Sequence, residues 1–195
     1  EFHIWGSHID TLEKPDRIIF DIDPDAGLDF GRVRAAACRI RDVLKEWGLQ
    51  SYPMVTGGKG VHVIAPLRPV TEWPLVKLFC RTFAQRLEDN EPDSFTANIR
   101  KVQRQGRMFV DYLRNERGAT AVTPFSTRAR PGVPCAVPVG WDELDRLKAA
   151  NQFDIEAAAE RAGQPDPWPD YFELTQSITK GMVEADAGPL KDLEQ

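Results

Sequence analysis

Two aspartates interrupt an apolar stretch near the start of the chain, "IIFDIDPD", residues 18 to 25. If this stretch is a strand, Asp21 and Asp23 point to the same face, where their like charges repel each other. Turn chemistry in "DPDAG" accounts for Asp23 and Asp25 but leaves Asp21 unexplained. A buried charge is costly unless it is paired or bound to a metal. The pair therefore predicts a divalent-cation site at the end of a strand, because Mg²⁺ and Mn²⁺ prefer carboxylate oxygens.

A third carboxylate interrupts a second hydrophobic stretch, "FVDYLRN", residues 109 to 115. If Asp111 lies on a strand next to the first two aspartates, it completes a two-metal cluster. Such clusters hold two cations about 4 Å apart and stabilise the attacking and leaving oxygens of a phosphoryl transfer. Arg114 and Arg128 would then neutralise a triphosphate as bidentate donors to phosphate oxygens.

A glycine-rich segment, "TGGKGVH", runs from Thr56 to His62. Glycines let a backbone approach a phosphate closely, and Lys59 supplies positive charge. The segment is not a Walker A loop, and it joins two expected strands instead of opening a helix. A plain hairpin with a surface lysine has the same pattern. His62 favours the phosphate site, because an imidazole beginning an apolar strand can donate to a phosphate or assist proton transfer.

These residues need a sheet to position them. Hydrophobic periodicity predicts a fold of mixed α and β (α+β), with helices on the face of a sheet. The expected strands are 1–6, 16–23, 50–56, 61–67 and 107–113. The expected helices are 31–47, 72–88 with Thr71 as its cap, a short one at 95–104, and the segments "WDELDRLKAA" and "IEAAAERA". Residues 114–140 are expected to be rich in loops.

The bulk composition bounds the class of protein. A chain of 195 residues with 42% hydrophobic residues fits one domain, which we divide into a catalytic core to about residue 150 and a helical tail, 151–195. No apolar run or signal sequence predicts a membrane segment. The three cysteines are far apart and form no CxxC pair, which argues against a disulfide framework or zinc and favours the cytoplasm.

The charge distribution is uneven. The net charge of −5 argues against nucleic acid, but residues 100–130 hold eight Lys/Arg and two acids, +6, so the remainder is −11. A local basic patch on an acidic protein suits phosphate binding. A solvated basic surface explains the charge count equally well.

Taken together, the motifs resemble a known family. The segments "EFHIW", "RIIFDIDPD", "TGGKGVH", "FVDYLRN" and "TPFSTRARPGVPCAVPVGWDEL" closely resemble the polymerase domain of bacterial DNA ligase D, of the archaeo-eukaryotic primase superfamily, which serves in non-homologous end joining. The resemblance implies an RRM-like catalytic sheet and metal-dependent addition of nucleotides, with ribonucleotides favoured, to DNA 3′ ends. It implies Mn²⁺ or Mg²⁺ as cofactors. It also implies NTP or dNTP, primer-template or 5′-phosphorylated DNA ends, Ku and a ligase domain as partners, and a bacterial, nucleoid-associated location.

The resemblance also implies roles for single residues. Asp21, Asp23 and Asp111 match the metal-binding aspartates of the family. The nucleotide-binding positions are Thr56, Gly57, Gly58, Lys59 and His62 in the glycine-rich motif, Arg128 as a triphosphate contact, and His3 and Arg114 near the site. Thr56 departs from the serine that is usual in the family. Relatives also carry a DNA-gripping segment upstream of "EFHIW", so we expect this chain to keep the metal and nucleotide cradle but to bind DNA weakly.

Two other classes of protein remain open. A haloacid-dehalogenase-like phosphatase would use a hydrophobic-DxD motif as nucleophile and acid. That family wants Thr or Val two residues past the second aspartate, where this chain has Asp25, and the phosphatase leaves the glycine-rich hairpin and Asp111 unexplained. A non-catalytic module that binds DNA ends needs only the basic patch, and it leaves all three aspartates without a role.

Overall fold

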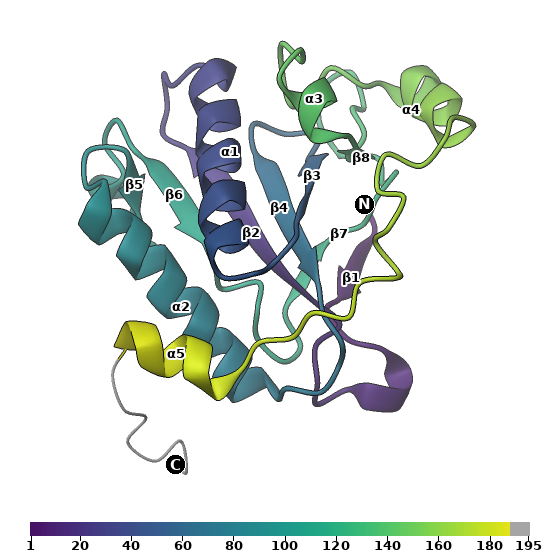
Figure 1. The fold of residues 1–195 in the computed structure, drawn as a ribbon. Coiled ribbons are helices and arrows are strands. Elements are labelled where there is room, and N and C mark those ends of the chain that lie inside the picture. The colour runs from purple at the N-terminus through teal and green to yellow at the C-terminus, as the bar shows by residue number, and fades with distance from the viewer. Residues whose placement is uncertain (188–195) are drawn as a thin grey trace.

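A six-stranded sheet forms the scaffold of the computed structural model, which describes residues 1–187 (Figure 1). The strand order is β5-β6-β2-β4-β3-β8, and every pair is antiparallel except β5 with β6. The strands are β2 (Arg17–Pro24), β3 (Tyr52–Val55), β4 (Val61–Pro66), β5 (Phe95–Thr96), β6 (Met108–Asp111) and β8 (Val137–Pro138). The predicted mixture of a sheet with flanking helices is confirmed.

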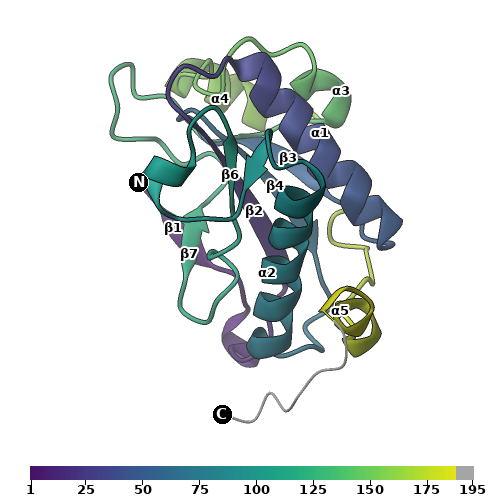
Figure 2. The ribbon, with the colours of Figure 1, turned by 90° about the vertical axis from the view of Figure 1, so that its left-hand side faces the viewer.

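Two long helices, α1 (Phe30–Glu46) and α2 (Trp73–Asn90), cover one face of this sheet (Figures 1 and 2). Alternate residues of β2, namely Ile18, Phe20 and Ile22, are fully buried in the core between the sheet and these helices. Because side chains alternate along a strand, the odd-numbered residues of β2 must face the other way. The helices thus fix which face of β2 carries Asp21 and Asp23.

A second, two-stranded sheet lies on the opposite face, where β1 (His3–Trp5) pairs antiparallel with β7 (Thr120–Val122) (Figure 2). A smaller apolar cluster fills the space on this face, and it includes Ile19, Val122 and Trp168. Ile19 is covered by this cluster, whereas Asp21 and Asp23 lie on the same face of β2 but outside it. The incomplete cover opens a cavity above the two aspartates.

Of the helix expected over 141–150, only Trp141–Leu144 is helical. Two further local expectations are wrong. Residues 95–104 do not form a helix, because β5 adds to the sheet beside β6 and is followed only by a short 3-10 turn, η2 (Lys101–Gln103). Thr71 does not cap α2: the cap position is Glu72, and the Thr71 hydroxyl donates to the carbonyl of Ile178 at 2.6 Å. In both cases a tertiary contact overrides the local signal.

The segments after β8 lie at two places in the molecule, with α3 (Trp141–Leu144) and α4 (Ile155–Ala162) far from α5 (Lys180–Ala187) (Figure 1). A short 3-10 turn, η1 (Ile9–Thr11), follows β1. The predicted tail, 151–195, is helical only in α4 and α5, and 188–195 lie outside the described residues. Trp168, between those helices, donates to the carbonyls of Pro53 and Val139, so the tail packs against the sheet. None of the described helices has the length and apolar character needed to cross a membrane.

Candidate functional site

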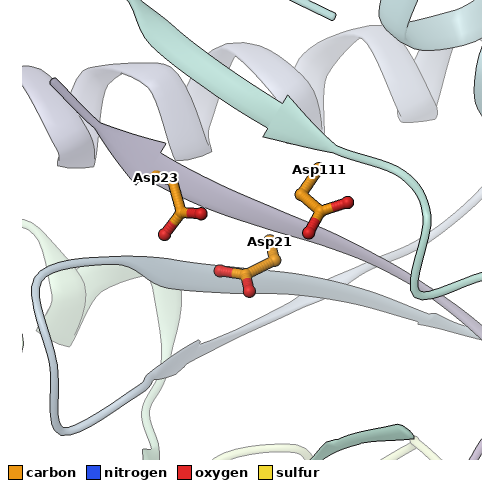
Figure 3. Close-up of side chains that lie close together, drawn as sticks. All are labelled: Asp21, Asp23 and Asp111. Atoms are coloured by element: carbon orange, nitrogen blue, oxygen red, sulfur yellow. The ribbon is translucent and has the colours of Figure 1, made fainter. Parts of the chain in front are cut away.

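Three carboxylates converge on the face of the sheet away from α1 and α2 (Figure 3). Antiparallel pairing of β2 and β6 places Asp21 directly opposite Asp111, and Asp23 follows two residues along on the same face of β2. One oxygen of each carboxylate lies within 4.8 Å of the other two. Asp21 and Asp111 are each only 8% exposed. The structure therefore brings together all three residues that the sequence singled out as metal ligands.

Basic side chains surround the three carboxylates. His62 lies on β4, directly opposite Asp21 of β2, and its Nε2 is 3.4 Å from Asp21 Oδ2. The Arg114 guanidinium lies 3.6 Å from Asp21 Oδ2 and 3.5 Å from Asp111 Oδ2. Arg104 reaches Asp23 more loosely, at 3.9 Å. These contacts compensate part of the negative charge that three close carboxylates create.

The three carboxyl groups differ in acidity. Burial alone would raise the pKa of Asp21, but His62 and then Arg114 outweigh it, so the pKa is lowered. Burial, followed by the charges of Asp21 and Asp111, raises the pKa of Asp23 to about 6. Burial also raises the pKa of Asp111, against the opposing effects of the Leu113 amide and Arg114. Burial and mutual repulsion thus disfavour the state in which all three carboxylates are ionised, as expected where a cation is to be bound.

The glycine-rich hairpin between β3 and β4 forms a tight turn beside the aspartates. The Thr56 hydroxyl donates to the Gly60 carbonyl at 3.0 Å and accepts from the Gly58 amide at 3.3 Å. Gly60 passes so close to β2 that a Cβ there would lie 2.3 Å from the carbonyl oxygen of Ile22. Gly57 has φ of 67°, a conformation that favours glycine. The hairpin is therefore held against the strand that carries Asp21 and Asp23.

Arg128 approaches the hairpin from the loop between β7 and β8. Its guanidinium donates to the Thr56 carbonyl at 2.5 Å, and its side chain is only 14% exposed. A Cβ on Gly57 would lie 2.8 Å from Arg128 Cγ, so the glycine makes room for the arginine. The predicted triphosphate contact and the glycine-rich motif are thus adjacent in space, although about seventy residues separate them in sequence.

A polar cavity of about 310 Å³ joins these parts. Of the predicted site residues, Gly57 and Asp111 are absent from its lining: the Gly57 amide donates to the Ala150 carbonyl instead. Arg104, Arg130 and Gly60 also line the cavity and were missed as site residues. The predicted residues that do line it are His3, Asp21, Asp23, Thr56, Gly58, Lys59, His62, Arg114 and Arg128.

The missed residues carried only part of a signal. Arg104 and Arg130 belong to the basic segment 100–130, but charge alone does not show which arginines face the cavity. The central carbon of the Arg104 guanidinium lies over the Phe109 ring, 3.8 Å from its centroid, and this contact directs it toward Asp23. The position of Arg104 depends on the pairing of β2 with β6, which sets Asp23 opposite Phe109, so it could not be predicted from the local sequence.

Comparisons with known proteins agree with this geometry. Residues 1–168 match the family model of the LigD primase-polymerase domain. The chain is 40% identical over 185 residues to the multifunctional non-homologous end joining protein LigD of Pseudomonas aeruginosa, covering 93% of this chain and 22% of that protein. It is 28% identical over 178 residues to the bifunctional LigD of Bacillus subtilis, covering 90% and 29%.

A solved structure shows the same fold. The polymerase domain from Mycobacterium tuberculosis Ligase D in complex with DNA superimposes with a TM-score of 0.75 at 29% identity, covering 84% of this chain and 57% of that one. The chain spans only 22% of the length of the LigD relative from Pseudomonas aeruginosa. From the family match over residues 1–168, together with these likenesses, the chain belongs to the LigD primase-polymerase domain family.

Proposed function

We propose that this chain is a metal-dependent nucleotidyltransferase that adds nucleotides, with ribonucleotides favoured, to DNA 3′ ends during non-homologous end joining. The observation that carries the proposal is the triad of Asp21, Asp23 and Asp111, two of which line one cavity with the glycine-rich hairpin and the surrounding arginines. Carboxylates beside an excess of phosphate-binding donors suit a cation and an anionic substrate together. Family membership supports the same reaction class.

The donor set fits divalent cations of the Mg²⁺ or Mn²⁺ type. All three groups offer hard carboxylate oxygens, with no cysteine among them, and their ligand atoms lie within 4.8 Å of one another. The raised pKa of Asp23 and Asp111 is a further fit, because a bound cation would relieve the repulsion that causes part of it. When bound, the metals supply charge neutralisation for the attacking and leaving oxygens.

The basic residues are assigned to the substrate phosphates. Lys59 is exposed at the tip of the hairpin and lines the cavity, where its ammonium can meet a triphosphate. Arg128 is preorganised by its bond to the Thr56 carbonyl. Donors fixed before the reaction stabilise developing phosphate charge without reorganisation. His62, Arg114 and His3 complete the polar lining of the cavity, with His62 and Arg114 also in contact with Asp21.

DNA is the proposed second substrate. The matched Mycobacterium tuberculosis polymerase domain was solved with DNA. In this chain the basic segment 100–130 supplies Arg104, Arg114, Arg128 and Arg130 to the cavity, and other basic groups of the segment, such as Arg100 and Lys101, are exposed. Neutralisation of backbone phosphates by such groups drives DNA binding. Ku and a ligase domain are further proposed partners, as the resemblance to DNA ligase D implies.

One assay separates this proposal from its rivals. The chain is incubated with a labelled primer-template, Mn²⁺ and a nucleoside triphosphate, and primer extension is measured beside phosphate release from a small phosphate ester. Extension supports the nucleotidyltransferase. Ester hydrolysis without extension would indicate the phosphatase, and DNA binding without either reaction would indicate a binding module.

Substitutions assign the reaction to the triad. Asp21→Asn, Asp23→Asn and Asp111→Asn should each abolish extension while circular dichroism shows an intact fold, because each removes one charged ligand but keeps the side-chain volume. The matched control is Asp29→Asn, since Asp29 caps α1 by accepting from the Arg32 amide and asparagine caps equally well. Near-normal extension by any triad variant would remove that residue from the metal site.

A further inference from the structure

Glu1 makes three contacts that bear on Arg128, a residue that the proposed function assigns to the triphosphate. Glu1 Oε1 accepts from the backbone amide of Ala129 at 2.9 Å and lies 3.2 Å from Nε of Arg128. Its other oxygen lies 3.1 Å from Nε2 of His3. One carboxylate therefore ties together a loop amide, an arginine and a histidine, and the last two line the cavity.

The loop that carries Arg128 is irregular but has hydrogen bonds of its own, such as that from the Arg128 amide to the Pro134 carbonyl at 2.8 Å, and Glu1 adds a contact next to Arg128. Residues 123–136 form no regular strand, and two non-glycine residues in them, Phe125 and Val133, adopt positive φ of 61° and 43°. The start of the chain holds this loop at three points: the Phe2 carbonyl accepts from the Thr123 amide at 3.1 Å, the Phe2 amide donates to Ser126 Oγ at 2.8 Å, and Glu1 accepts from the Ala129 amide. Glu1 thus fixes the backbone immediately after Arg128.

The arginine is oriented from two sides. Its NH1 group donates to the Thr56 carbonyl, and its Nε lies against Glu1, although the Nε–H is not aligned for a hydrogen bond. Contacts on both edges restrict rotation of the guanidinium plane. The hydrogen bond from His3, then the Ala129 amide and Arg128, lower the pKa of Glu1 to about 2, so the carboxylate is charged at neutral pH.

We infer that Glu1 is a positioning residue for nucleotide binding: it fixes the Arg128 loop and His3 in the arrangement that receives the triphosphate. The inference rests on the proposed function of the cavity. Glu1 itself belongs to neither the acidic triad nor the cavity lining. The alternative is that the Glu1 carboxylate occupies the position of a substrate phosphate and is displaced when the nucleotide binds. In that case removing the carboxylate would strengthen nucleotide affinity.

The test compares Glu1→Ala and Glu1→Gln with the wild-type chain. Glutamine keeps an oxygen that can accept from Ala129 but loses the charge beside Arg128 and His3. The matched control is Glu13→Ala, since Glu13 is an exposed glutamate that also pairs with an arginine, Arg117, and does not line the cavity. Three quantities are measured at fixed salt: hydrogen exchange of the Ala129 amide, Mn²⁺ affinity without nucleotide, and nucleoside triphosphate affinity with Mn²⁺.

We expect Glu1→Ala to speed exchange of the Ala129 amide and to weaken nucleotide affinity about tenfold, comparable to losing an outer-shell partner of a bound ion. Mn²⁺ affinity without nucleotide should stay within about twofold, because the contacts of Glu1 are with Ala129, Arg128 and His3 and not with a triad residue. Glu1→Gln should lie between alanine and wild type for both exchange and nucleotide affinity, and Glu13→Ala should match the wild type.

Unchanged or tighter nucleotide binding by a folded Glu1→Ala variant would overturn the inference while leaving the proposed function in place. If Glu1→Ala fails to fold, unchanged nucleotide affinity in Glu1→Gln, together with unchanged Ala129 exchange, would overturn it equally. If the wild-type chain bound Mn²⁺ but no nucleotide, the proposed function would fall, and this inference with it.

Discussion

Asn115 continues the hydrogen-bonding ladder along β2 at Ile19, beyond the point where β6 has ended. Its side-chain oxygen accepts from the Ile19 amide and its side-chain nitrogen donates to the Ile19 carbonyl, both at 2.7 Å. The same nitrogen donates to the Tyr112 carbonyl at 2.9 Å. The Asn115 side chain therefore replaces the backbone of a strand residue as the hydrogen-bond partner of Ile19, and the chain can turn after Asp111. That turn places Arg114 against Asp21 and Asp111.

Replacing Asn115 with alanine should destabilise the protein by about 2–4 kcal/mol, because it leaves the buried N–H and C=O of Ile19 without partners. Urea unfolding measures the change. The control is Asn98→Ala, which removes an amide that caps an exposed turn by accepting from the Arg100 amide. The interpretation fails if both variants lose the same small amount of stability.

Cation affinity should fall with pH below about 6. Burial and the charges of Asp21 and Asp111 raise the pKa of Asp23 to about 6, so below that pH the metal must displace a proton from Asp23. The expected slope is about tenfold in affinity per pH unit below 6, flattening above it. Mn²⁺ titrations between pH 5 and 8, followed by electron paramagnetic resonance, measure the slope.

Asp23→Asn provides the control for that slope. Asparagine cannot bind the competing proton, so this variant should bind Mn²⁺ more weakly at neutral pH and lose less affinity between pH 7 and pH 5. An identical pH dependence in the two proteins would mean that another group binds the competing proton.

Gly60→Ala should disrupt the hairpin, because the new Cβ would lie 2.3 Å from the Ile22 carbonyl oxygen and force β4 away from β2. We expect a loss of about 2 kcal/mol or more in the free energy of unfolding. Gly140→Ala is the comparison, since no atom of residues 1–187 lies within 4 Å of a Cβ there, and the expected cost stays below about 1 kcal/mol. Equal costs would show that β4 adjusts without strain.

Lys59→Ala should weaken nucleotide affinity about tenfold, because a charge-assisted contact to phosphate is lost, and should largely spare DNA binding. Nucleotide affinity and binding of a 5′-phosphorylated duplex are measured separately at one salt concentration. Lys45→Ala, an exposed lysine in the last turn of α1, controls for the change in net charge. Weaker DNA binding with unchanged nucleotide affinity would assign Lys59 to DNA.

The sequence by itself indicated five of the strands, β1, β2, β3, β4 and β6, and the carboxylates that β2 and β6 carry, whereas β5, β7 and β8 were not predicted. Alternation in β2 separates Ile18, Phe20 and Ile22 from Asp21 and Asp23, because side-chain direction in a strand depends only on position along it. The α1 helix was equally readable, since its apolar spacing and its closing Gly48, at φ of 74°, are local features. The glycine-rich hairpin was predicted from its own composition for the same reason.

Only the tertiary structure decided how these parts meet. Sheet order brings β6 beside β2 and so sets Asp111 opposite Asp21, while stacking on Phe109 directs Arg104 toward Asp23. The contact of Glu1 with the Ala129 amide joins residues that are 128 positions apart in sequence. Pairing between distant segments depends on which surfaces the whole chain buries together, and no local pattern along the sequence encodes it.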